Sequence, residues 1–144
     1  MHAVRDFFAF IGRLGIGIVL IAHGWQKLVD YGMGAVADSF AQMNIPLPQL
    51  SAWFTALVEL VGGAFLILGL LLPLVGILIA VVMAGAVFFV HLPHGIFSPE
   101  GFELPLIIGV AALALGFNGG RWSIDHGLFG RRRSTPTEPE PSST

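Results

Sequence analysis

A run of 31 residues, from Leu60 to Val90, contains no charged side chain and no histidine. As a single helix rising about 1.5 Å per residue it would be roughly 46 Å long, well beyond a hydrocarbon core of about 30 Å. The run must therefore reverse direction, and the stretch "LGLLLPLVG" supplies Gly69 and Pro73 for the turn. We expect one membrane helix over about 51–72 and the next over about 74–92.

Two further apolar segments complete the pattern. The first covers about 7–28 and is interrupted by Arg13, and the last, "ELPLIIGVAALALGF", covers about 103–118. The last is short for a helix that crosses alone, so its ends need shielding by neighbouring helices. Charged residues make up 11% of the chain, against roughly 25% in soluble domains. The sequence therefore predicts an all-α integral membrane four-helix bundle that occupies residues 1–130.

The segment between the first two helices has a different periodicity. Met33, Val36, Phe40 and Met43 follow one another at helical spacing, and polar side chains lie between them. This pattern predicts a short amphipathic helix at the membrane surface, in the first extracytoplasmic loop, where it could cover the bundle as a lid. The final stretch, 131–144, has no apolar residue and is rich in Pro, Ser and Thr, which predicts a disordered cytoplasmic tail.

The basic residues predict the orientation of the helices. Arg5 and Arg13 precede or begin the first helix, and Arg121 and the arginines of 131–133 follow the fourth. The two loops at the other side offer only Lys27. By the positive-inside rule, both termini lie in the cytoplasm and the chain is a multi-pass protein of the cytoplasmic membrane.

Composition also limits the chemistry. The chain has no cysteine, which excludes thiolate metal sites, iron–sulfur clusters and disulfide exchange carried by this chain alone. The net charge of -2, without a basic stripe, gives no indication of a nucleic-acid partner. A redox role would therefore need a bound cofactor, a quinone or a partner protein.

The predicted topology gathers ionisable residues at one level of the bundle, toward the extracytoplasmic side. A charged group inside a membrane is costly, at about 2.5–3.5 kcal/mol near the helix centre, and is usually paired or functional. Carboxylates and imidazoles are also the groups that most often move protons. The candidate catalytic residues of this outer polar cluster are His23, Lys27, Glu59, His91 and Glu103.

Small residues predict which way these side chains face, because transmembrane helices approach closely at glycine and alanine. Glu59 shares its helical face with a glycine pair, and His23 aligns with Gly12 and Gly15. These faces should point toward other helices. Glu103 does not align with the small residues of its helix, which makes an inward position weaker for it than for the others.

Simpler interpretations of the same residues stay open. Lys27 could extend to the lipid headgroups, and Glu59 could be a purely structural partner of Lys27 or Arg13. His23 and His91 could instead hold a b-type haem across the bundle, although two histidines are a weak signal. The sequence gives no firm set of metal ligands.

Four stretches of the chain resemble the DoxX family of small four-helix membrane proteins. They are "GRLGIGIVLIAHGWQKL", "FTALVELVGGAFLILGLLLPL", "HLPHG…GFELPLII" and "GGRWSID", and the resemblance as a whole covers the chain from about Arg5 to Asp125. The positions that carry the resemblance are Arg13, His23, Gly24, Lys27, Glu59, Gly62, Gly63, Glu103, Ser123 and Asp125.

The resemblance implies a bacterial membrane protein associated with redox chemistry, because the family is similar to a subunit of thiosulfate:quinone oxidoreductase. It implies links to sulfur or oxidative-stress metabolism, a quinone as the economical cofactor, and a partner oxidoreductase as the source of electrons. It does not imply that the chain is catalytic alone. Two alternatives stand beside it: a non-catalytic binder of a lipid or small hydrophobic ligand, and a scaffold that docks a soluble redox enzyme. Homo-oligomerisation is also open.

Overall fold

A computed structural model describes residues 1–97 and 99–130, and all regular structure in this part is helical. The predicted disordered tail, 131–144, lies outside the described residues. The all-α fold expected from the sequence is confirmed. In chain order the elements are α1 (His2–Trp25), η1 (Gln26–Tyr31), α2 (Met33–Gln42), α3 (Pro48–Leu68), α4 (Leu72–Gly85), η2 (Ala86–His91), η3 (Leu92–His94), α5 (Glu103–Phe117) and α6 (Ile124–Phe129).

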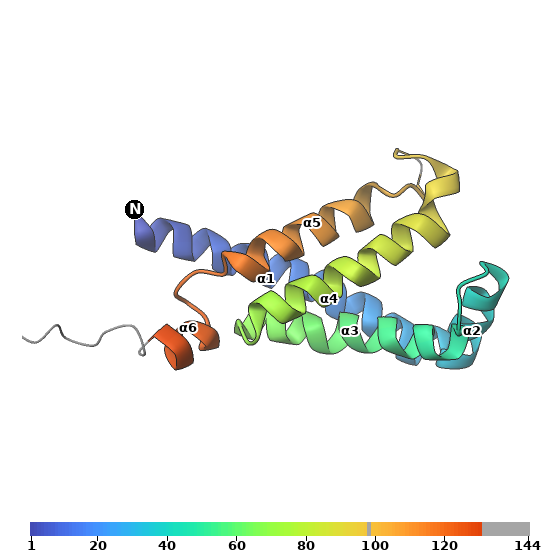
Figure 1. The fold of residues 1–144 in the computed structure, drawn as a ribbon, viewed down its shortest axis with the longest axis horizontal. Coiled ribbons are helices and arrows are strands. Elements are labelled where there is room, and N and C mark those ends of the chain that lie inside the picture. Colours follow the sequence, from blue (N-terminus) through green and yellow to red (C-terminus); the bar gives the residue numbers. More distant parts are fainter. Residues whose placement is uncertain (98, 131–144) are drawn as a thin grey trace, which may run out of the picture.

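The four long helices form two pairs, α1 with α3 and α4 with α5 (Figure 1). Both pairs have one end near the start of α1, the turn between α3 and α4, and α6, which we call the N-terminal end (Figure 1). They diverge toward the loop end, which carries η1, α2 and the α4–α5 connection (Figure 1). The core joins all four helices through Leu20, Leu66, Ile79 and Ile108, each at most 4% exposed.

The long apolar run reverses direction between Gly69 and Pro73, as the sequence predicts. Gly69 ends α3 with φ of +72°, a left-handed conformation that glycine adopts without strain, and Leu70 N–H donates to the Phe65 carbonyl at 2.9 Å. Pro73 occupies the first turn of α4, where its missing N–H has no helical partner to lose. The chain thus turns within three residues, and α4 runs back beside α3.

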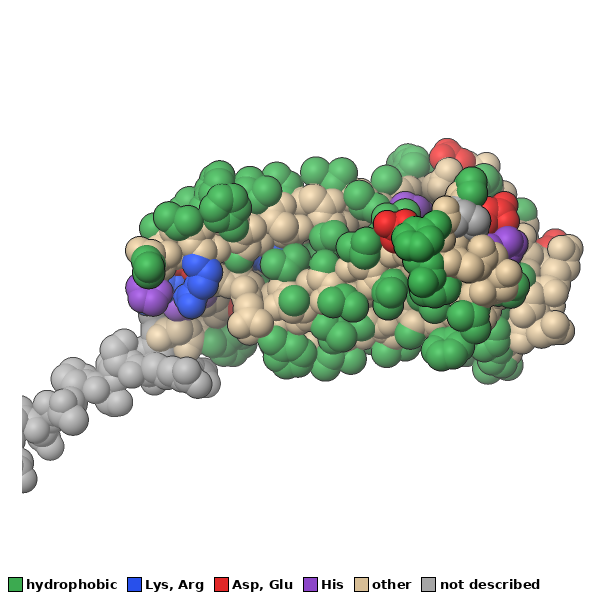
Figure 2. All heavy atoms as spheres, turned by 90° about the horizontal axis from the view of Figure 1, so that it is seen from above, with side chains coloured by type: hydrophobic (Ala, Val, Ile, Leu, Met, Phe, Trp, Pro, Cys, Tyr) green, Lys and Arg blue, Asp and Glu red, His purple; other side chains and the backbone are tan. Residues whose placement is uncertain are grey.

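Three segments are long and apolar enough to cross a membrane: His2–Tyr31, Pro48–Leu68 and Leu72–His94. The first begins five residues before the expected start at 7. The fourth helix, α5, has 15 residues, about 22 Å, and packs along α4. Apolar side chains cover the middle of the surface, whereas charged side chains and histidines gather toward its two ends (Figure 2). This distribution is typical of an integral membrane bundle.

Glycines set the close approach of α1 and α3, where the predicted Gly63 of α3 meets Gly17 of α1. A Cβ on Gly17 would lie 2.7 Å from the Gly63 carbonyl oxygen, and one on Gly24 would lie 2.7 Å from the Leu60 nitrogen. Gly15, by contrast, faces open space. The face of α1 that meets α3 thus contains Gly17 and Gly24, whereas the expected small-residue face meets a helix at Gly12, beside Leu115 of α5, and not at Gly15.

Gly17→Ala should lower the free energy of unfolding by about 1–3 kcal/mol, because the added methyl group overlaps backbone atoms of α3. Gly15→Ala, two residues away on the same helix, should be neutral or slightly stabilising. Thermal unfolding in one detergent would compare the two variants with the parent. Equal stability of both variants would contradict this contact.

Candidate functional site

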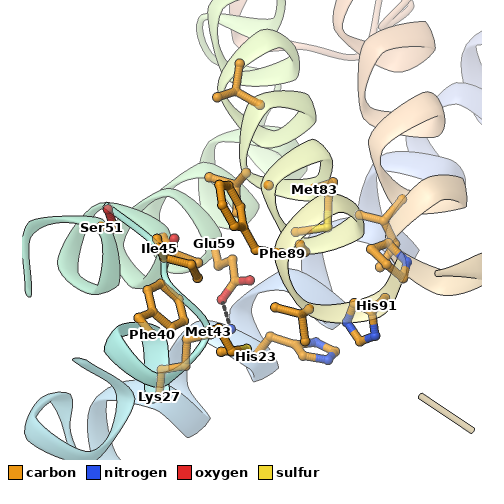
Figure 3. A pocket seen from close by; sticks show the side chains of 18 of the residues that line it. His23, Lys27, Phe40, Met43, Ile45, Ser51, Glu59, Met83, Phe89 and His91 are labelled. Atoms are coloured by element: carbon orange, nitrogen blue, oxygen red, sulfur yellow. Dashed lines mark hydrogen bonds and ion pairs between the residues drawn. The ribbon is translucent and has the colours of Figure 1, made fainter. Parts of the chain in front are cut away.

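A cavity of about 480 Å³ lies at the loop end, between the diverging helix pairs (Figure 3). All four long helices and the segment after α2 contribute to its walls. The apolar side chains of this outer cavity include Leu20, Phe40, Met43, Ile45, Phe54, Met83, Phe89 and Ile108, and its ionisable ones are His23, Lys27, Glu59 and His91. The structure therefore brings four of the five predicted polar residues to one cavity.

The shortest polar contact in the outer cavity is an ion pair. Lys27 Nζ lies 2.6 Å from Glu59 Oε2, and the two side chains are 19% and 5% exposed (Figure 3). A charge-assisted bond of this length fixes both side chains, and each charge offsets the cost of burying the other. The predicted alternative in which Glu59 pairs with Lys27 is the arrangement found here, with the pair facing the cavity.

Helix geometry explains how the two charges meet. Glu59 lies on the buried face of α3, in line with Ala56, Gly62 and Gly63, where small side chains let the helices close in. Lys27 lies in η1, where the last turns of the first helix widen from α to π geometry. Such a widening changes the direction in which side chains leave the axis and often occurs at functional sites.

His23 occupies the turn before Lys27 and also faces the outer cavity. Its Nδ1 lies 2.8 Å from the Val19 carbonyl oxygen, one turn earlier on α1. A carbonyl can only accept, so Nδ1 carries the proton of this bond. In the neutral ring, Nε2 is then the nitrogen that accepts a hydrogen bond or a proton.

His91 ends η2, the second segment with π geometry, and reaches the outer cavity from α4. Its Nδ1 lies 2.7 Å from the Glu100 carbonyl oxygen in the α4–α5 connection. This bond again assigns the proton to Nδ1 and leaves Nε2 as the acceptor of the neutral ring. The two histidines of the cavity are thus held in the same tautomer by backbone oxygens.

Glu103, the fifth predicted residue, lies elsewhere. It begins α5, is exposed, and does not line the outer cavity. Pro105, Ile108 and Ala112 form the buried face of α5, and Glu103 is on the opposite side. His94 is also exposed, with Nε2 3.1 Å from the Glu100 carboxylate, and belongs to the surface of the α4–α5 connection.

The amphipathic helix expected between the first two membrane helices is α2. Val36 and Ala37 are buried against Ala52 of α3, which holds α2 on the bundle. Phe40 and Met43 extend from its end to the wall of the outer cavity, beside Lys27 (Figure 3). The predicted helix exists, and it closes one side of the cavity.

Within residues 1–97 and 99–130, no three His, Asp or Glu side chains are grouped so that they could hold a metal ion. The polar side chains of the outer cavity are one ion pair, two imidazoles and the hydroxyl groups of Ser51 and Thr55. They can donate and accept hydrogen bonds and transfer protons to a molecule in the cavity.

A second buried charge lies near the N-terminal end. Arg13 is fully buried, and its Nη2 donates to the carbonyl oxygen of Trp122. Asp125, three residues further along, accepts from the backbone N–H groups of Leu71 and Leu72 at 2.8 and 2.7 Å. The carboxylate therefore caps the N-terminus of α4, where helix N–H groups are otherwise unpaired.

This second cluster was only partly predictable. Arg13, Ser123 and Asp125 belong to the quoted motifs, but their mutual contacts were not expected. Asp6 was missed entirely: it is 3% exposed, and its Oδ1 accepts from the Arg121 N–H at 3.1 Å. An aspartate near the start of a membrane helix was the only signal for it.

Fold and site together define a class: a small integral membrane four-helix bundle with a buried ion pair in an apolar cavity. A comparison with protein families identifies it further, since the DoxX family model matches residues 8–92. The chain belongs to the DoxX family. The matched range contains all four ionisable residues of the outer cavity, and it ends before Glu103 and the segment from Arg121 to Asp125.

Two relatives extend the comparison. "Putative oxidoreductase CatD" of Bacillus subtilis is 32% identical over 103 residues, which cover 72% of this chain and 74% of the relative. An uncharacterized protein of Haemophilus influenzae is 31% identical over 140 residues, which cover 90% and 96% of the two chains. No solved structure matches the chain.

Proposed function

We propose that this chain is the integral membrane component of a redox system, and that its outer cavity binds the head of a quinone. The name of the Bacillus subtilis relative and the family support the redox role. The observation that carries the quinone proposal is an apolar cavity of about 480 Å³ that contains a buried Lys27–Glu59 pair. Small-molecule sites typically have this size and this combination of apolar walls and few polar groups.

The cavity fits a quinone in chemical terms. Phe40, Phe54 and Phe89 provide apolar surface for a flat ring. Lys27 Nζ has donors beyond the one it gives to Glu59, and they can bind a carbonyl oxygen. Reduction of a quinone to a quinol adds two electrons and two protons. Glu59 and the histidines, each once protonated, would deliver protons to the two oxygens.

The electrons must come from outside the chain. The sequence has no cysteine, and the described residues offer no metal cluster. A partner oxidoreductase subunit is therefore the electron donor in this proposal. The role of this chain is then to hold the head of the quinone and to deliver protons where the partner delivers electrons.

A second candidate function rests on the same ion pair. An ammonium group beside an apolar cavity also suits the phosphate of a lipid, so the chain could bind a lipid or small hydrophobic ligand without catalysis. This alternative predicts that the parent retains a phospholipid and no quinone, and that Glu59→Gln loses this phospholipid.

The test is native mass spectrometry of gently solubilised protein, followed by organic extraction of the bound molecules. The parent should retain a quinone, and both Glu59→Gln and His91→Ala should lose most of it. Glu103→Gln is the matched control, because it makes the same carboxyl-to-amide change outside the cavity. A phospholipid lost in the same pattern would favour the second candidate. Protein that retains neither molecule would overturn both.

A further inference from the structure

A second hollow, of about 970 Å³, opens at the N-terminal end and takes no part in the proposed redox site. The start of α1, the turn between α3 and α4, the end of α5 and the short helix α6 surround it. Arg5, Arg121 and His126 bring three basic side chains to this inner hollow. Blue and purple side chains gather at this end of the molecule in Figure 2.

The carboxylates near the inner hollow are already engaged by the backbone. Asp125 uses one oxygen for the Leu71 N–H and the other for the Leu72 N–H. Asp6 is buried and accepts from the N–H of Arg121. These bonds hold Asp6 against the backbone of Arg121, and they hold Asp125, which lines the hollow, against the turn between α3 and α4.

The guanidinium groups remain available to a ligand. Arg5 is 67% exposed and meets Asp6 only at 3.9 Å, which makes a weak surface pair. Arg121 is exposed, and within residues 1–97 and 99–130 its side chain forms no ion pair. Arg5 and Arg121 both line the hollow, and two arginines at one site are suited to a phosphate group, which they can bind through paired N–H donors.

The same hollow has an apolar wall. Leu71, Phe117 and Phe129 line it and are 43%, 63% and 57% exposed. Trp122 and Leu128 lie close by in the chain and are also exposed. A free anion would contact only the basic side chains, whereas an amphiphile with a phosphate head and acyl chains would contact these and the apolar wall together. The combination therefore selects a lipid over a soluble phosphate compound.

We propose that the inner hollow binds the phosphate headgroup of an anionic phospholipid between Arg5 and Arg121, with its acyl chains against Phe117. The positive-inside distribution of arginines predicts that this end faces the cytoplasm, where anionic headgroups attract basic residues. The proposal is independent of the quinone proposal, because the two hollows share no lining residue.

The test is a titration of the detergent-solubilised full chain with dioleoylphosphatidylglycerol or dioleoylphosphatidylcholine, with bound lipids counted by native mass spectrometry. Arg5→Gln/Arg121→Gln should weaken binding of the phosphatidylglycerol about tenfold or more and leave the phosphatidylcholine unchanged. Arg132→Gln/Arg133→Gln removes the same charge from the end of the chain and should change binding less than twofold. Thermal unfolding would verify that the variants fold. Arg121→Gln keeps the backbone N–H that donates to the Asp6 carboxylate.

Three results would overturn the proposal. The parent could bind both lipids equally, or the Arg132/Arg133 control could lose as much affinity as the hollow variant, which would indicate unspecific attraction. Inorganic phosphate at millimolar concentration could displace the phosphatidylglycerol, which would indicate a site for a free anion. If the double variant fails to fold, Arg5→Gln alone repeats the test, because that side chain is largely exposed.

Discussion

Lys27→Met should lower the free energy of unfolding of the bundle by about 3 kcal/mol, the cost expected when one partner of a buried ion pair is removed. The variant leaves the Glu59 carboxylate, which is 5% exposed, without its counter-charge. Methionine keeps most of the length of the lysine stem, so lost packing contributes little. Reversible unfolding in mixed micelles would give the free energy.

The double variant Lys27→Met/Glu59→Leu tells whether the loss comes from an unpaired charge. It removes both charged groups and should recover much of the stability, because buried ion pairs can often be replaced by apolar residues without loss. Glu103→Gln should leave stability within about 0.5 kcal/mol, since Glu103 is exposed. If Lys27→Met were as stable as the parent, the pair would have no structural role and would serve the ligand alone.

Asp125→Ala should also cost about 3 kcal/mol, although the residue is far from the outer cavity. The substitution removes two hydrogen bonds from a charged acceptor, to the N–H groups of Leu71 and Leu72, and each is worth about 1.5–3 kcal/mol. It also removes a negative charge that acts on the buried Arg13 guanidinium group. Differential scanning calorimetry of the purified protein would measure the change in Tm.

Asp125→Asn is the matched variant for this prediction. Its amide keeps one oxygen that can accept a hydrogen bond but loses the negative charge, so it should be intermediate between the parent and Asp125→Ala. Quinone retention should be unaffected by either variant, because Asp125 does not line the outer cavity. An Asp125→Ala protein with the Tm of the parent would show that the cap of α4 contributes nothing to stability.

Much of this architecture follows from the sequence because membranes impose simple rules. The uncharged run from Leu60 to Val90 is too long for one crossing, and Gly69 is the residue that can take a left-handed turn. The α2 helix follows from the spacing of Met33, Val36, Phe40 and Met43. The sequence left Lys27 and Arg13 as alternative partners of Glu59, because a buried charge needs a counter-charge, and the structure selects Lys27.

Other features depend on rotations that periodicity cannot fix. The helices widen to π geometry at Gln26–Tyr31 and Ala86–His91, which changes the direction in which the later side chains leave the helix axis. No pattern in the sequence predicts this widening. Which glycine face of α1 meets α3 depends on the crossing geometry of the pair, and the structure selects Gly17 and Gly24. Glu103 does not share the face of Gly109, Ala112 and Gly116, and the structure places it outside the outer cavity.

The helix α6 and its contacts were beyond sequence reasoning for another reason. It has only six residues, Ile124–Phe129, and its position is set by long-range bonds, not by its own pattern. Asp125 contacts residues more than fifty positions away, and Trp122 contacts Arg13 at a separation of 109. One sequence without aligned relatives contains no information on such pairs.

That separation has a consequence for the order in which the protein is assembled. Arg13 lies in α1, whereas its carbonyl partner at Trp122 is synthesised 109 residues later in the chain. Until then the guanidinium group must be solvated by other groups, such as lipid headgroups or the insertion machinery. The segment from Arg121 to Asp125 thus bonds to α1 and to the α3–α4 turn only after both have been synthesised.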